Sequence, residues 1–127
     1  MVYIVESDKS FYEACVDLEE VILRLGFSLL QGHDLAAAAG DKGSDFDEEA
    51  KVFEIDSLRL TERLLAVDVR LSMALPCRIT VFTEDGATKI GMLRPLSMFG
   101  ALSRAPGLER IARDLEEKMI QVVDEAR

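Results

Sequence analysis

Residues 77–93 read CRITVFTEDGATKIGML, and this stretch carries the strongest local structural signal in the chain. Apolar and polar residues alternate over residues 77–84, with the period of a half-buried β-strand. Asp85-Gly86 suits a tight turn, and a second apolar run follows over residues 87–93. The stretch therefore predicts an antiparallel β-hairpin. Pro76 suits the start of its first strand, because proline donates no ladder hydrogen bond.

Two long amphipathic helices are predicted on either side of this hairpin. Ser10 and Glu13 have the spacing of a capping box. Apolar residues then recur every three or four positions over residues 11–25, up to the helix-ending Gly26. A second such stripe runs over residues 108–123. Because both stripes need an apolar partner, we expect both helices to cover the same face of one sheet.

The remaining elements complete an α+β chain. Strands are predicted over residues 2–6, 27–31 and 51–55. A helix capped by Ser57 is predicted over residues 57–67, and one helical turn over 97–102. Residues 32–42 are predicted to form a loop or a short alanine-rich helix, and residues 41–49 an acidic surface connection. The order β-α-β-(α)-β-α-β-β-α predicts one domain over residues 1–127. We expect a two-layer α/β sandwich with helices on one sheet face and a partly open second face.

Composition limits the possible partners and the compartment. The chain has 127 residues, of which 49% are hydrophobic, and a formal net charge of −9. A mean hydropathy of +0.11 argues against disorder. The negative charge disfavours nucleic acid and acidic membranes as partners. The apolar residues at the start of the chain are interrupted by Glu6 and have no basic segment before them, so we expect a cytoplasmic protein.

The two cysteines, Cys15 and Cys77, show no metal or disulfide spacing. Cys15 lies on the apolar stripe of the first helix. Cys77 alternates with Ile79 and Val81, which favours a buried, inert thiol. The alternative is a thiol-dependent enzyme or sulfur-handling protein, with Cys77 as the nucleophile and Arg78 lowering its pKa.

The second sheet face is the main candidate for a binding surface. If the hydrophobic strand positions face the helices, six residues face the other way: Glu54, Arg78, Thr80, Phe82, Lys89 and Leu93. Large apolar groups in such a set are typical of an interface or a ligand surface. We favour a homodimer contact over a small-ligand pocket, and a pocket formed where two subunits meet combines both.

Other candidate sites carry weaker signals. His33 is interpreted as a solvated or backbone-bonded residue rather than a ligand or base. The acidic run over residues 45–49 lacks the glycine and spacing of a calcium loop, so we predict no metal site. No glycine-rich phosphate-binding pattern occurs, so no cofactor is predicted.

Several short segments resemble the domain of unknown function 302 family. They are Val2-Tyr3-Ile4-Val5, Ser10-Phe11, Gly26-Phe27, Leu75-Pro76-Cys77-Arg78-Ile79-Thr80-Val81-Phe82, Glu84-Asp85-Gly86 and Thr88-Lys89-Ile90. The resemblance implies a two-layer α/β fold similar to the TATA-binding-protein type, with no established activity. It matches Pro76 and Cys77 to the family's Pro-Cys pair and Asp68 to an acidic residue that ends the preceding helix.

The chain departs from that family pattern at two places. Many relatives have Cys-Asn-Pro where this chain has Asp56-Ser57-Leu58, and Ile-Gly where it has Leu71-Ser72. The first change removes any role that needs a second cysteine there. Taken together, the sequence predicts a small-ligand-binding or partner-binding homodimer without demonstrated catalysis.

Overall fold

The predicted hairpin forms the middle of a five-stranded antiparallel sheet. In this computed structural model, which describes residues 1–40 and 47–127, strand β4 (Cys77–Glu84) pairs with β5 (Ala87–Leu93). Asp85 and Gly86 have φ values of 51° and 86°. Positive φ at both central residues is the geometry of a two-residue hairpin turn that follows the twist of the strands. The antiparallel hairpin is therefore confirmed.

The other strands extend the sheet on both sides of the hairpin. Strand β1 (Val2–Ser7) pairs with β5, and β3 (Ala50–Asp56) joins β4 to β2 (Ser28–Asp34), in the order β1-β5-β4-β3-β2. Strand β2 is shifted relative to the predicted range 27–31, because its pairing with β3 continues to Asp34. Its register changes between Leu29 and Gln31.

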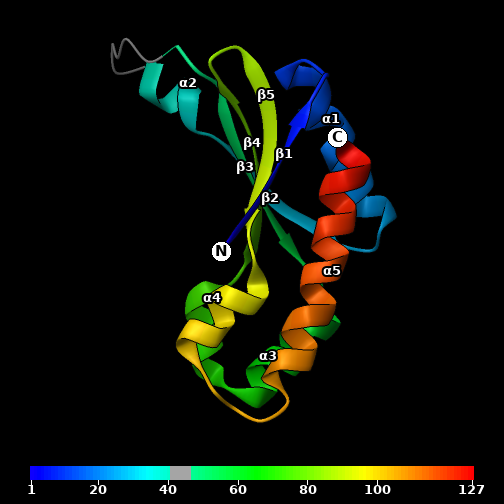
Figure 1. Cartoon of the computed structure of the whole chain (residues 1–127), viewed down its shortest axis with the longest axis vertical. Coiled ribbons are helices and arrows are strands. Elements are labelled where there is room, and N and C mark those ends of the chain that lie inside the picture. Colours follow the sequence, from blue (N-terminus) through cyan, green and yellow to red (C-terminus); the bar gives the residue numbers. More distant parts are fainter. Residues whose placement is uncertain (41–46) are drawn as a thin grey trace.

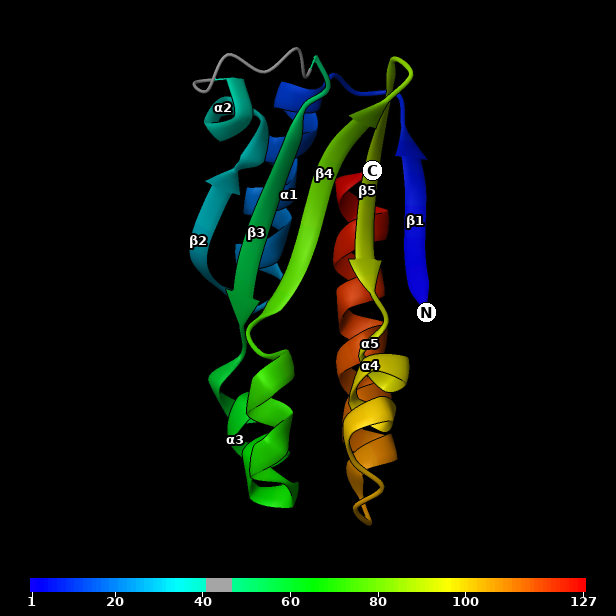
Figure 2. The ribbon, with the colours of Figure 1, turned by 90° about the vertical axis from the view of Figure 1, so that its left-hand side faces the viewer.

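Helices α1 (Phe11–Arg24) and α5 (Leu108–Ala126) cover the same face of the sheet, as Figures 1 and 2 show, so this prediction is confirmed. Beneath them the core includes Phe53, Ile79 and Ile90, all with no exposed surface. The Ser10 hydroxyl accepts a hydrogen bond from the Glu13 backbone N–H at 3.1 Å, which satisfies one free donor at the start of α1.

The shorter helices lie mostly beyond one end of the sheet. Helix α3 (Leu58–Val67) and the 3₁₀ helix η1 (Val69–Ala74) follow β3, and α4 (Pro95–Leu102) follows β5 (Figure 2). Helix α2 (Leu35–Gly40) lies at the opposite end. Helix α4 begins earlier than the predicted 97–102 turn, because Pro95 is the first helical residue, a position that needs no N–H. Among the described residues, no helix is long and apolar enough to cross a membrane.

The free edge of β1 is covered at two points by arginines. Arg94 Nε donates to the Val2 carbonyl oxygen at 3.3 Å, and Arg127 Nε donates to the Glu6 carbonyl oxygen at 2.9 Å. The Arg94 guanidinium also lies 5.4 Å from the centre of the Tyr3 ring. Two of the outward-facing carbonyls of this edge strand are therefore already hydrogen-bonded within the chain.

The two serine N-caps allow a matched test of the helix starts. Ser10→Ala should lower the free energy of unfolding by about 1 kcal/mol, because the capped N–H loses its partner. Ser57 occupies the N-cap position of α3 but makes no capping hydrogen bond with its side chain. Ser57→Ala should therefore cost much less in the same urea titration. Equal losses for the two variants would contradict this account.

Candidate functional site

The sheet face that the helices leave uncovered, here called the open face, holds all six predicted residues. Cross-strand pairs place Glu54 opposite Arg78 and Phe82 opposite Lys89. Thr80 lies between Arg78 and Phe82 on β4, and Leu93 lies opposite Val2. Side chains alternate between the faces of a strand, so these residues share the side away from the buried Ile79 and Val81.

One half of the open face carries a polar cluster of His33, Glu54 and Arg78. The His33 Nε2 atom lies 2.6 Å from Glu54 Oε1, and Arg78 Nε lies 3.8 Å from Glu54 Oε2. The interpretation of His33 as a solvated or backbone-bonded residue was therefore wrong. Its partner could not be read from sequence spacing, because the register of β2 on β3 brings the two side chains together.

The other half carries an apolar patch of Val2, Ile4, Phe82 and Leu93. Val2, Ile4 and Leu93 are each about half exposed, at 51%, 50% and 51%. They border a shallow hollow of about 280 Å³ with Gly91 in its lining. A Cβ at Gly91 would lie 3.1 Å from Ile4 Cγ1 and 3.5 Å from Phe82 Cε1, so both side chains close over the glycine backbone.

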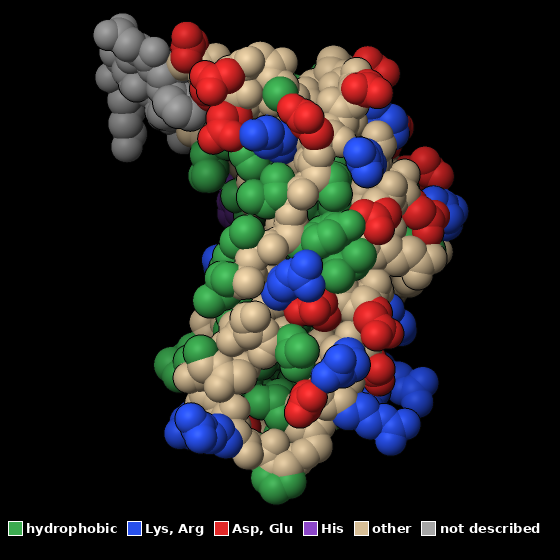
Figure 3. All heavy atoms as spheres, in the orientation of Figure 1, with side chains coloured by type: hydrophobic (Ala, Val, Ile, Leu, Met, Phe, Trp, Pro, Cys, Tyr) green, Lys and Arg blue, Asp and Glu red, His purple; other side chains and the backbone are tan. Residues whose placement is uncertain are grey.

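Figure 3 shows hydrophobic side chains gathered along the left-hand flank of the molecule, where the open face lies. Sequence reasoning did not include Val2 and Ile4 in this surface. Both belong to β1, which pairs with β5 although the two strands lie far apart in the sequence. Only the order of the strands in the sheet therefore places Val2 and Ile4 beside Leu93. The alternation of Val2 and Ile4 with Tyr3 and Val5 indicates that the two pairs face opposite sides of the sheet. It does not reveal that β5 is the neighbouring strand.

Cys77 lies on the opposite side of β4, under the helices. It is 6% exposed, and burial raises the pKa of its thiol to about 12, with a smaller contribution from the charge of Asp56. At pH 7 the thiol is therefore protonated. Arg78, the proposed activator, projects to the open face. Both observations disfavour a nucleophilic role.

Cys15 is buried in the same core, as its place on the helix stripe predicts. It is 7% exposed, and burial raises the pKa of its thiol to about 11. Both cysteines are free thiols.

The acidic segment before β3 supports the hairpin. Asp45 and Phe46 lie outside the described residues. Glu48 accepts hydrogen bonds from the Thr83 hydroxyl at 3.0 Å and from the Asp85 N–H at 2.8 Å, so it braces the turn rather than forming part of a solvated face. Within residues 1–40 and 47–127, no group of three His, Cys, Asp or Glu side chains is placed to hold a metal ion.

Asp68, the acidic residue matched by the family resemblance, joins α3 to η1. The Arg70 guanidinium donates to both carboxylate oxygens of Asp68, at 2.8 and 3.2 Å. The backbone N–H of Arg70 also donates to Asp68 Oδ1, at 3.0 Å. These bonds, together with one from Ser103, hold the pKa of the Asp68 carboxyl well below its usual range. The contacts are local, and they give Asp68 a structural role at the junction.

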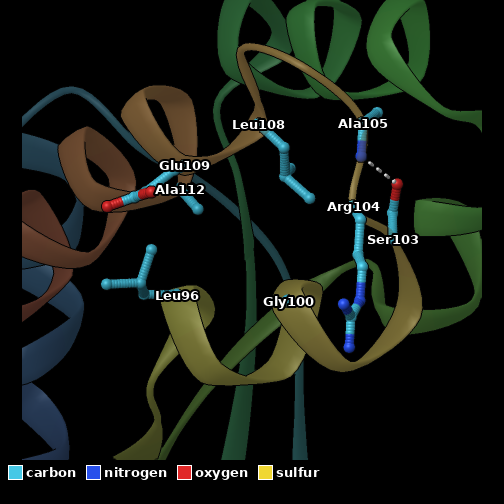
Figure 4. A pocket seen from close by; sticks show the side chains of 8 residues that line it. All are labelled: Leu96, Gly100, Ser103, Arg104, Ala105, Leu108, Glu109 and Ala112. Atoms are coloured by element: carbon cyan, nitrogen blue, oxygen red, sulfur yellow. Dashed lines mark hydrogen bonds between the residues drawn. The ribbon is translucent and has the colours of Figure 1, made fainter.

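A second hollow lies between α4 and α5, at the end of the molecule beyond the sheet (Figure 4). Its volume is about 380 Å³. The lining comes from α4 (Leu96, Gly100), the loop that follows it (Ser103, Arg104, Ala105) and the start of α5 (Leu108, Glu109, Ala112). Sequence reasoning missed this site, because it depends on how two helices and their connecting loop pack together.

Comparisons with known proteins agree with the fold. The family described as "Domain of unknown function DUF302" matches residues 3–126. The chain is similar to the crystal structure of an uncharacterized conserved protein DUF302 from Bacillus stearothermophilus, with a TM-score of 0.93 and 29% sequence identity. That match covers 99% of this chain and 98% of the other. No curated protein matches the chain.

The burial of Cys77 predicts a specific pattern of variants. Cys77→Ser should lower the free energy of unfolding by about 1–3 kcal/mol, because it places a hydroxyl in an apolar site. Cys77→Ala and Cys77→Val should cost less, because they keep the site apolar. In a Cys15→Ala background, iodoacetamide should modify Cys77 more slowly in the folded chain than in urea. Faster modification of the folded chain would contradict the buried role.

Both buried thiols also predict a loss of stability at alkaline pH. Their pKa values are raised in the folded chain, so above about pH 9 the unfolded state holds fewer protons than the folded state. The free energy of unfolding should therefore fall between about pH 9 and 11. A Cys15→Ala, Cys77→Ala variant should show a shallower fall in urea titrations at several pH values. Identical slopes would show that other groups cause the loss.

Proposed function

The chain belongs to the DUF302 family, whose function is not established, and on the geometry of the open face we propose that it is a partner-binding homodimer. In this proposal the open face of one protomer packs against the open face of a second copy. The observation that carries the proposal is the apolar patch, where three half-exposed aliphatic side chains adjoin one hollow. Contiguous exposed apolar groups are typical of protein interfaces.

The size of the open face fits such a contact. Five strands about 4.8 Å apart and about seven residues long span roughly 500 Å². Two such faces together present on the order of 1,000 Å², which is the lower range of specific interfaces. The hollow of about 280 Å³ that Val2, Phe82 and Leu93 border leaves room for an apolar side chain from the partner.

Charge also favours a second copy on this face. Two chains of net charge −9 repel each other, so a contact between them needs a surface of balanced charge. The open face offers that balance, because Arg78 lies near Glu54 and Lys89 bonds Glu84 at 2.7 Å. A symmetric dimer can also align the apolar patch of one protomer with that of the other.

The face is a better contact surface than the edge of the sheet. Pairing through β1 would require its outward carbonyls to accept hydrogen bonds from another strand. Those of Val2 and Glu6 already accept from Arg94 and Arg127. The side chains of Val2 and Ile4, in contrast, stay available on the open face.

A charge placed in the apolar patch should therefore prevent dimer formation. We expect the wild-type chain to elute as a dimer in size-exclusion chromatography with light scattering. Phe82→Glu and Ile4→Glu should shift it to monomer, because an unpaired charge in a desolvated contact costs several kcal/mol.

A matched control comes from another exposed aliphatic residue. Leu23 is 58% exposed on α1, away from the open face. Leu23→Glu should leave the dimer intact. A monomeric wild-type chain at high concentration would refute the proposal, and so would equal effects of Leu23→Glu and Ile4→Glu.

A further inference from the structure

We propose that the hollow between α4 and α5 binds a small organic acid, with one carboxylate on an apolar body. The hollow is lined by helices on two sides and by the connecting loop (Figure 4). Its apolar lining residues include Leu96 and the buried Leu108 and Ala112. Its volume of about 380 Å³ is at the small end of the range for ligand pockets.

Gly100 is the first observation that supports a ligand. It lies inside α4, where glycine destabilises a helix relative to alanine. Its φ is not positive, and a Cβ built on it would meet no atom within 4 Å. Neither backbone conformation nor packing therefore requires glycine at this position. What the missing side chain provides is open space beside the hollow that Gly100 lines.

Arg104 supplies the charge that a carboxylate would bind. It is exposed, it lines the hollow, and it forms no ion pair or side-chain hydrogen bond with any residue the structure describes. Guanidinium groups bind carboxylates through two parallel hydrogen bonds. Figure 4 shows the Arg104 side chain on the loop side of the hollow, near the end of α4 that carries Gly100, and both residues line the hollow.

The other charged group at the hollow does not compete for this role. Glu109 accepts a hydrogen bond from Arg113 at 2.7 Å, one turn further along α5. In Figure 4 its side chain points away from Arg104. Among the described residues, Arg104 is thus the cation without a partner at this hollow, and it lies beside apolar lining residues, a combination that matches a monocarboxylate with an aliphatic or aromatic body.

This site is separate from the open face and does not depend on the dimer. Helix α4 lies beyond the end of the sheet, whereas the apolar patch lies on β1, β4 and β5 (Figure 2). Loss of the dimer and loss of ligand binding can therefore be measured independently.

Titration of ¹⁵N-labelled protein with sodium octanoate tests the proposal by two-dimensional NMR. The amide signals of Gly100, Ser103 and Leu108 should shift in a saturable way, and those of Ile4 and Gly91 should not. Octan-1-ol, which has the same chain without the carboxylate, should bind at least tenfold more weakly, because it cannot pair with Arg104.

Variants separate the contribution of the Arg104 charge from that of the open space at Gly100. Arg104→Gln should weaken octanoate binding about tenfold. Arg110→Gln is the matched control, because Arg110 is an exposed arginine on α5 that does not line the hollow. Gly100→Leu should abolish binding by filling the hollow, and Gly100→Ala should keep α4 folded with weaker binding.

Three results would overturn the proposal. They are shifts that do not saturate, shifts centred on Ile4 and Gly91, and an octanoate affinity unchanged by Arg104→Gln. If Gly100→Leu loses the dispersed spectrum of a folded chain, Arg104→Gln and Gly100→Ala still decide the outcome.

Discussion

Burial of one side of the β4–β5 hairpin under α1 and α5 is the constraint on which the rest of the structure depends. Ile79, Val81 and Ile90 have no exposed surface, so their positions on the helix side are fixed. Side chains of a strand alternate with period two, and this burial sends Arg78 and Phe82 to the open face. A shift of one residue in register would exchange the two sets.

This constraint also explains how much could be predicted from sequence. The alternation in the hairpin and the helix stripes are local patterns, so they predicted the layers and all six open-face residues. The pair of His33 with Glu54 depends on the register change between Leu29 and Gln31, which no local pattern reveals. The apolar patch needs the sheet order, and the hollow at Arg104 needs the packing of α4 on α5.

The open face and the hollow between α4 and α5 differ in the structural elements that position their residues. The open face is part of a continuous sheet, so its residues on β3, β4 and β5 are positioned by backbone ladders on both sides, and those on the edge strands β1 and β2 by a ladder on one side. The second hollow is enclosed by α4, α5 and one loop, and so depends on how two helices pack. Cys77 belongs to neither site. Its Pro-Cys pair, matched by the family resemblance, lies where β4 enters the core, which gives the thiol a role in packing.

The arginine contacts on β1 have a consequence for how the chain behaves in concentrated solution. An apolar edge strand with free carbonyls is a template for stacking chains into aggregates. Strand β1 has the composition of such a template, because Val2, Ile4 and Val5 are β-branched and no proline or lysine interrupts it. Arg94 and Arg127 occupy two of these carbonyls and place positive charge at the edge. Both effects oppose the pairing of β1 with a strand from another chain.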